Sequence, residues 1–128
     1  MADQLEENKR NVVAFYALMF NQGKPAEAVE KYVGDAYVQH NPGAADGKQA
    51  FIEQFTRMAA QYPGKCAQFK RVIAEGDLVV LHCFQHWPGD RDLAGIEIFR
   101  VDERGRIVEH WDELQMVPLR STSSKTTS

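Results

Sequence analysis

The stretch Gly95–Gln115, GIEIFRVDERGRIVEHWDELQ, decides how the rest of the chain is interpreted. Two runs with strand-like alternation, Ile96–Val101 and Arg106–Gln115, flank the segment DERG. The acidic residues of that segment can bond their own backbone, and its glycine tolerates a positive φ, as tight turns require. The stretch therefore predicts a β-hairpin.

Ionisable side chains interrupt the apolar pattern of both arms of this hairpin. Because side chains alternate between the two faces of a strand, Glu97 shares a face with Phe99, and His110 shares one with Asp112. An acid among apolar neighbours, and a His/Asp pair two residues apart, could line a pocket. The same residues could also lie solvated on an open sheet face, and the spacing leaves both interpretations open.

Length and composition favour a single ordinary globular domain. The chain has 128 residues, of which 44% are hydrophobic and 26% charged, and its net charge is −3. The basic residues are scattered, which argues against a nucleic-acid surface. The charged N-terminus has no signal-peptide core, and no apolar run approaches a membrane span. Cys66 and Cys83 fit neither a disulfide framework nor metal-ligand spacing, so we expect reduced thiols in a cytoplasmic protein without membrane or nucleic-acid partners.

The N-terminal half contains three predicted helices. An apolar stripe at helical spacing extends over Leu5–Phe20, and a short second helix follows at Pro25–Tyr32, with proline in its first turn. A third helix begins at Asp46, which together with Gln49 has the outline of a capping box. Pro63 marks the end of the third helix.

The remaining pattern predicts strands. Gly34 ends the second helix, and Ala36–Asn41 is a short extended segment before Pro42. From Lys65 onward the period changes to two, which predicts a four-stranded meander. Its strands are Cys66–Ala74, Leu78–Trp87, Leu93–Val101 and Arg106–Gln115. This order predicts an α+β domain over residues 1–118, with three N-terminal helices packed on one face of a curved, mainly antiparallel sheet. Residues 119–128 form a polar tail that we expect to be disordered.

Four passages of the chain carry a resemblance to a known family. They are FYALMFNQG, YVQHNP with the following DGK, GIEIFRVDERGRI, and EHWDELQ. In this order they resemble the NTF2-like superfamily, and more narrowly its SnoaL-like branch of polyketide cyclases and predicted aldol-condensation enzymes. The resemblance covers roughly Asn8 to Pro118 and implies a cone-shaped, cystatin-like fold. The superfamily also contains isomerases, dehydratases and non-enzymatic ligand-binding or assembly domains.

The resemblance also implies roles for particular residues. Ketosteroid isomerases share the fold, and their oxyanion hole uses a tyrosine near the end of the first helix and an acid in the third meander strand. Those positions are matched here by Tyr16 and Glu97. The isomerase base falls at His40 or Asn41, where this chain has no carboxylate, which argues against a steroid isomerase. In SnoaL-type cyclases the base is an aspartate near the end of the last strand, and its counterpart is Asp112.

Five residues are therefore predicted to be catalytic. They are Asp112 as general base, Glu97 as a second carboxylate or alternative base, His110 and His40 as proton carriers, and Tyr16 as oxyanion donor. For Glu97 the alternative is a salt bridge to Arg71 or Arg100. For Asp112 the alternatives are a surface position or a partner that merely orients His110. For the histidines and the tyrosine the alternative is the ordinary hydrogen bonding of a folded core.

A wider set is predicted to bind substrate. It consists of Tyr37, Asn41, Trp111, Gln85, Phe99, Phe15 and Phe55. No metal or cofactor site is predicted. His82 and His86 share one strand face, but four strand residues span about 13 Å, too far for both to bind one ion. When that strand is aligned with the isomerase pattern, both histidines are expected on the outer face of the sheet.

Two functions follow as hypotheses. The first is a small cofactor-independent enzyme that binds an apolar carbonyl compound in the cone and catalyses proton transfer, in an aldol-type cyclisation or isomerisation. The second is a non-catalytic ligand-binding or dimerisation domain of the same fold. In both cases we expect a homodimer through the outer sheet face, which would cover Trp87, Trp111 and the two outer histidines.

Overall fold

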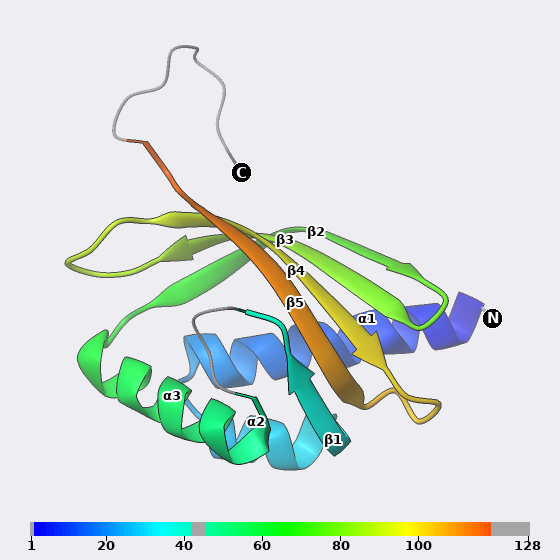
Figure 1. Ribbon diagram of the computed structural model, residues 1–128. Coiled ribbons are helices and arrows are strands. Elements are labelled where there is room, and N and C mark those ends of the chain that lie inside the picture. The colour runs from blue at the N-terminus through cyan, green and yellow to red at the C-terminus, as the bar shows by residue number, and fades with distance from the viewer. Residues whose placement is uncertain (1, 42–45, 119–128) are drawn as a thin grey trace.

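The computed structural model describes residues 2–41 and 46–118 and confirms the predicted α+β class (Figure 1). The helical elements come first. They are α1 (Ala2–Tyr16), the π-helical turn η1 (Ala17–Asn21), α2 (Pro25–Tyr32) and α3 (Lys48–Gln61). The strands are β1 (Val33–Gln39), β2 (Cys66–Glu75), β3 (Leu78–His86), β4 (Leu93–Val101) and β5 (Ile107–Met116). The tail predicted to be disordered, residues 119–128, lies outside the described residues.

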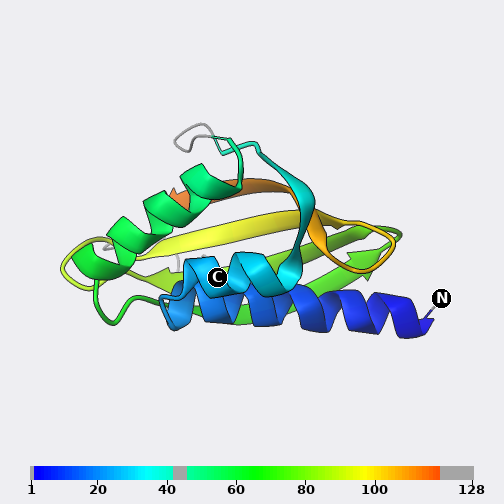
Figure 2. The ribbon, with the colours of Figure 1, turned by 90° about the horizontal axis from the view of Figure 1, so that it is seen from below.

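The five strands form one mixed sheet in the order β1-β5-β4-β3-β2. Strands β2 to β5 pair antiparallel as the predicted meander, whereas β1 pairs parallel with β5 at the edge. The sheet curves over the helices, which all lie on its inner face (Figure 2). None of the helices in the described ranges is long and apolar enough to cross a membrane.

The first helix changes its geometry where it reaches the centre of the molecule. The predicted helix Leu5–Phe20 is α-helical only to Tyr16, and the next turn is a π-helix. The side chain of Lys65 holds this turn, because its Nζ donates to the carbonyl oxygen of Phe20 at 2.6 Å and lies 4.0 Å from the centre of the Phe20 ring. This contact satisfies one of the carbonyl groups that a helix end leaves unpaired.

The third helix begins differently from the prediction. Its N-cap is Gly47, with a φ of +93°, and no side chain caps it. The predicted capping box of Asp46 and Gln49 is therefore wrong. The Asp46 carboxylate instead accepts from the backbone N–H of Gln39, at 2.8 Å, and of Gly47, at 3.0 Å. Asp46 thus ties the end of β1 to the start of α3.

The strand β1 begins directly after α2 and contains Gly34, which the sequence suggested would only end the helix. A Cβ atom at Gly34 would lie 2.8 Å from Cγ1 of Val108 and 3.0 Å from Oδ2 of Asp102. The glycine therefore allows β1 to lie close against β5. This approach matters because the far end of β1 contributes polar side chains to the space between helices and sheet.

We expect Gly34→Ala to destabilise the fold by about 1–3 kcal/mol, because the added methyl group overpacks the contact between β1 and β5. Urea unfolding measures the change. The control is Ala36→Ser, which alters an exposed position of the same strand. Equal stabilities of the two variants would contradict this role for Gly34.

Candidate active site

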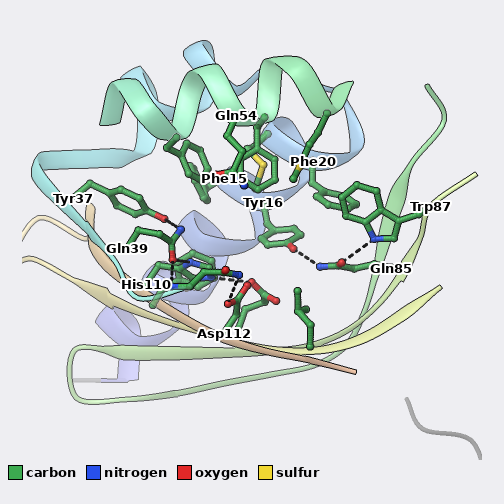
Figure 3. A pocket seen from close by; sticks show the side chains of 18 residues that line it. Phe15, Tyr16, Phe20, Tyr37, Gln39, Gln54, Gln85, Trp87, His110 and Asp112 are labelled. Atoms are coloured by element: carbon green, nitrogen blue, oxygen red, sulfur yellow. Dashed lines mark hydrogen bonds and ion pairs between the residues drawn. The ribbon is translucent and has the colours of Figure 1, made fainter. Parts of the chain in front are cut away.

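A cavity lies between the helices and the inner face of the sheet (Figure 3). Its volume is about 550 Å³ when its opening to solvent is included. The apolar part of its lining is largely aromatic and consists of Phe15, Met19, Phe20, Phe51, Phe55, Met58, Trp87, Phe99 and Leu114. The polar part consists of Tyr16, Tyr37, Gln39, Asn41, Gln54, Gln85, Glu97, His110 and Asp112. A few polar groups within an aromatic wall are typical of a small-molecule site.

The register of the sheet brings the ionisable groups together. Strands β4 and β5 pair Glu97 with Asp112 and Phe99 with His110. Alternation then turns these side chains toward the helices, which is the pocket-lining alternative of the two that the hairpin pattern left open. Ligand-type atoms of Glu97, His110 and Asp112 all lie within 4.8 Å of one another.

Glu97 is the most deeply buried ionisable residue of this group, with an exposed fraction of 1%. Its Oε1 lies 2.8 Å from Nε2 of His110, while its buried Oε2 has no hydrogen-bond partner among the described residues. Burial raises the pKa of Glu97, the charge of Asp112 adds to that effect, and the hydrogen bond from His110 opposes it. At neutral pH this carboxyl group is therefore easier to protonate than an exposed one.

The alternative of a salt bridge from Glu97 to an arginine is wrong. Arg71 hydrogen-bonds to Nδ1 of His82 at 2.9 Å, and Nε of Arg100 donates to Oε1 of Glu109 at 2.7 Å. Both arginines are thus engaged with other residues, and Glu97 is paired with a histidine.

Asp112 lies half-buried near the same cavity. Its Oδ1 accepts a hydrogen bond from the side-chain amide of Asn41 at 2.8 Å. Burial raises the pKa of Asp112, while the neighbouring His110 and the amide of Asn41 lower it. The Asp112 carboxylate is therefore held in place and is a stronger base than an exposed aspartate.

The distance between His110 and Glu97 in this cluster is that of a hydrogen bond. Two ligands of one zinc ion, each roughly 2.0–2.1 Å from the metal, would be about 3.3 Å apart in tetrahedral geometry. The 2.8 Å between His110 Nε2 and Glu97 Oε1 is shorter and fits a shared proton. A metal ion would have to separate this pair and replace that proton.

Tyr16 contributes a hydrogen-bond donor to the cavity. Its hydroxyl oxygen accepts from Nε2 of Gln85 at 2.7 Å, and Oε1 of Gln85 accepts from the indole N–H of Trp87 at 3.1 Å. Because an indole can only donate, the direction of this chain is fixed and the Tyr16 proton is left for another acceptor. Burial raises the pKa of Tyr16, so the phenol stays neutral.

Tyr37 offers a second phenol of the same kind. Its oxygen accepts from Nε2 of Gln39 at 3.0 Å, and burial raises its pKa as well. Tyr37 and Tyr16 both lie in the cavity lining. A ligand with an electron-rich oxygen could therefore accept a hydrogen bond from either phenol.

His40 and Trp111 are not brought into this cavity, and their predicted position there is corrected. Nε2 of His40 lies 2.7 Å from Oε2 of Glu109, and its ring stacks on Trp111 with centroids 4.8 Å apart. Alternation explains both placements, because Trp111 lies between two inward residues of β5, and His40 follows the inward Gln39 at the end of β1. The pair therefore occupies the outer face.

Trp87 lies at the cavity, and its predicted position on the outer face is wrong. It was expected on the outer interface, but its ring packs edge-on against the rings of Phe20 and Tyr62. The ring centroids are 5.3 Å apart for Phe20 and 5.0 Å apart for Tyr62. It also lines the cavity. The signal was present in the sequence, since Trp87 is two residues from the inward Gln85.

Sequence reasoning also missed the amide side chain of Gln39. The alternation of YVQHN places Gln39 between Tyr37 and Asn41, which were both predicted to line the pocket. Of the α3 residues in the cavity lining, the sequence analysis identified only Phe55. Residues at helical spacing from Phe55 lie on the same face of the helix. The further lining residues are Met19, Phe20, Phe51, Gln54, Met58 and Leu114.

The chain belongs to the SnoaL-like domain family, whose profile matches residues 12–110. A comparison with curated proteins gave no match. Among solved structures, a candidate polyketide cyclase from Acidithiobacillus ferrooxidans is similar at 22% identity, with a TM-score of 0.72 and coverage of 84% of this chain and 87% of that one.

Two Streptomyces proteins have similar structures. IdmH from Streptomyces antibioticus, described as a candidate polyketide cyclase, is 23% identical with a TM-score of 0.67, covering 83% of this chain and 91% of its own. TsrD from Streptomyces laurentii is 18% identical with a TM-score of 0.70, covering 84% of this chain and 88% of its own. At these identities the likeness establishes the fold that the sequence predicted.

We expect Glu97→Gln to change how stability depends on pH. The pKa of Glu97 is raised above its ordinary value of 4.5, so its contribution to stability is complete below pH 4.5 and is lost as the pH rises through the folded-state pKa. The loss is about 1.4 kcal/mol for each unit by which the folded pKa exceeds the unfolded one. Glutamine mimics the protonated acid and removes this loss.

Urea unfolding of both proteins between pH 5 and pH 8 measures the effect, with Glu103→Gln, an exposed turn residue, as the control. The free energy of unfolding of the wild type should decline relative to that of Glu97→Gln as the pH rises. Parallel pH profiles would contradict the assignment of a raised pKa to Glu97.

Proposed function

We propose that this protein is an enzyme that binds an apolar carbonyl compound in the cavity and moves a proton between carbon and oxygen, without a cofactor. The observation that carries the proposal is the buried Glu97, whose Oε2 has no partner in the described part of the chain, beside the half-buried Asp112. Burying an unpaired polar atom costs free energy, so such an atom within a cavity is often functional. Membership of the SnoaL-like family and the names of the structural relatives agree with this chemistry.

Asp112 is the proposed general base. Its carboxylate takes the proton from the carbon next to a carbonyl group, and the electron pair of that C–H bond moves onto the carbonyl oxygen as an enolate. The Tyr16 hydroxyl donates to this oxygen and stabilises its charge. A base with a raised pKa suits this step, because its proton affinity is closer to that of the reacting group at neutral pH.

The second half of the reaction distinguishes the two reaction types. In an aldol-type cyclisation the enolate carbon bonds to a second carbonyl carbon of the same molecule, and the resulting alkoxide takes a proton from Glu97 or from protonated Asp112. In an isomerisation the proton returns to another carbon of the enolate. Both sequences consume and release the same number of protons and need no redox cofactor.

A second candidate function is ligand binding without chemistry. It is favoured by the hydrogen bond between Glu97 and His110, because a mutually satisfied pair can be purely structural. The convergence of Tyr16, Glu97, His110 and Asp112 on one cavity favours the enzyme instead. The two functions make different predictions for proton exchange.

We expect the protein to accelerate hydrogen–deuterium exchange at the carbon next to the carbonyl of ketones that carry an aromatic ring, such as acetophenone and 2-tetralone, in D₂O, followed by NMR. Asp112→Asn should lower that rate by about 10²–10⁴-fold, the usual contribution of a general base, with an unchanged fold. The matched control is Glu113→Gln, an exposed carboxylate one residue further along β5. Equal rates for wild type and Asp112→Asn would reject Asp112 as the base, and ketone binding without any exchange would favour the ligand-binding function.

We also propose a homodimer through the outer face of the sheet. That face has a shallow apolar hollow formed in part by Leu78, Ile96, Ile98 and Trp111. Leu78 and Ile96 are 39% and 40% exposed in the single chain. Large apolar side chains grouped on one face are stabilised when a second surface covers them.

Sedimentation of the wild type at micromolar concentration should therefore give a dimer, and Ile96→Lys should give a monomer. The control is Lys31→Glu, an exposed change of charge on α2, which lies on the helical side of the sheet. A monomeric wild type would contradict this proposal.

A further inference from the structure

We infer that Gln39 is a positioning residue of the site, and that its side-chain amide fixes the tautomer of His110 so that Glu97 and His110 hold a single proton between them. The inference starts from hydrogen-bond directions alone. Only its catalytic consequence rests on the proposed function.

The orientation of the Gln39 amide is fixed by the backbone. The N–H of Asn41 lies 3.1 Å from Oε1 of Gln39, and Nε2 of Gln39 lies 3.0 Å from the hydroxyl oxygen of Tyr37. A backbone N–H can only donate, so the atom facing it must be the amide oxygen. The reversed amide would place one N–H group against another.

This orientation determines which nitrogen of His110 is protonated. Nδ1 of His110 lies 2.8 Å from the same amide oxygen. An amide oxygen only accepts, so Nδ1 must carry a hydrogen. His110 is 6% exposed and its ring stacks on Phe99, with centroids 4.5 Å apart, so the ring is held in this orientation.

The other nitrogen then sets the proton count of the pair. Nε2 of His110 lies 2.8 Å from Oε1 of Glu97, and this contact is a hydrogen bond only if one proton lies between the two atoms. With no proton between the two atoms, two lone pairs would face each other and repel. With a proton on each atom, two hydrogens would face each other and repel as well. With Oε2 unprotonated, the pair is therefore either imidazolium with carboxylate or imidazole with carboxylic acid, with Nδ1–H retained in both forms.

Other titratable groups lie near this pair on four elements of the fold. They are Asp112 on β5, Tyr16 on α1, Tyr37 on β1 and Cys83 on β3. Burial raises the pKa of Cys83 to about 12, and burial also keeps both tyrosines neutral. Asp112 is thus the charged group that acts most directly on the pair at neutral pH.

The catalytic consequence concerns the direction of proton movement. Because Nδ1–H is locked onto Gln39, the pair exchanges its proton only along the line between Nε2 and Oε1. Glu97 can then accept or release a proton toward a reacting oxygen while the His110 ring does not rotate. Asp112, the cross-strand partner of Glu97, is left free to take the proton from carbon.

NMR of ¹⁵N-histidine-labelled protein tests the tautomer without any substrate. One-bond and long-range ¹H–¹⁵N correlations distinguish a protonated from a bare ring nitrogen, and the His110 signals are those lost in His110→Gln. In the wild type we expect Nδ1 of His110 to be protonated throughout the pH range of the folded protein. A bare Nδ1 in the wild type would overturn the inference.

Two substitutions of Gln39 separate positioning from folding. Gln39→Leu removes the acceptor, and His110 should change to a form that is protonated on Nε2 and bare on Nδ1. Gln39→Glu keeps an acceptor oxygen for Nδ1–H, so it should retain the wild-type tautomer. Gln54→Leu is the matched control, because it makes the same change in the same cavity lining and Gln54 does not hydrogen-bond to His110 in the structure.

Retention of Nδ1–H in Gln39→Leu, or its loss in Gln39→Glu, would overturn the inference. If Gln39→Leu does not fold, the wild-type spectrum and Gln39→Glu still decide it. The result is also separable from the enzymatic proposal. An inactive protein with the expected tautomers would leave this inference standing, and an active protein with a bare Nδ1 would reject it alone.

Discussion

The hydrogen bond between Glu97 and His110 is the constraint around which the site is arranged. A carboxylate in an aromatic cavity would cost several kcal/mol if it were charged and unpaired. The fold meets this cost by placing a histidine on the same face of the neighbouring strand, two residues away from the cross-strand partner of Glu97, so that the two side chains share a proton. The other carboxylate oxygen of Glu97 has no hydrogen-bond partner among the described residues.

The edge strand β1 and the residues just after it supply the amide side chains that hydrogen-bond to His110 and Asp112 of the central hairpin. Its parallel pairing with β5 brings the end of β1 beside His110, so that Gln39 reaches the ring and Asn41 reaches Asp112. Gly34 permits the close approach of the two strands at one end, and Asp46 holds the other end against the start of α3. The hydrogen bonds of the site therefore depend on contacts between segments about 70 residues apart in the chain.

Much of this organisation could be predicted from the sequence. Period-two alternation put His110 on one face with Asp112 and Glu97 on one face with Phe99, the family resemblance implied that Glu97 and Asp112 line the cavity, and the order of elements predicted the α+β fold. The failures have physical causes. His40 was chosen because the isomerase base position of the resemblance falls at His40 or Asn41, and the inward side chain that contacts His110 is instead Gln39. Trp87 was assigned to the outer dimer interface for its apolar, aromatic character, although it shares a face with Gln85. No local pattern indicates that Asp46 bonds to Gln39 rather than capping α3, or that Lys65 holds a π-helical turn. These contacts join distant segments, and a single sequence does not encode them as periodicity.

Counting the protons on the Glu97–His110 pair tests the central claim most directly. Neutron diffraction from crystals of the perdeuterated, ligand-free protein near neutral pH locates each deuteron. One deuteron between Nε2 and Oε1, another on Nδ1 and none on Oε2 is the predicted result. A deuteron on Oε2, or a separation of Nε2 and Oε1 with no deuteron between them, would contradict it and would leave Glu97 without the partner that makes its burial possible.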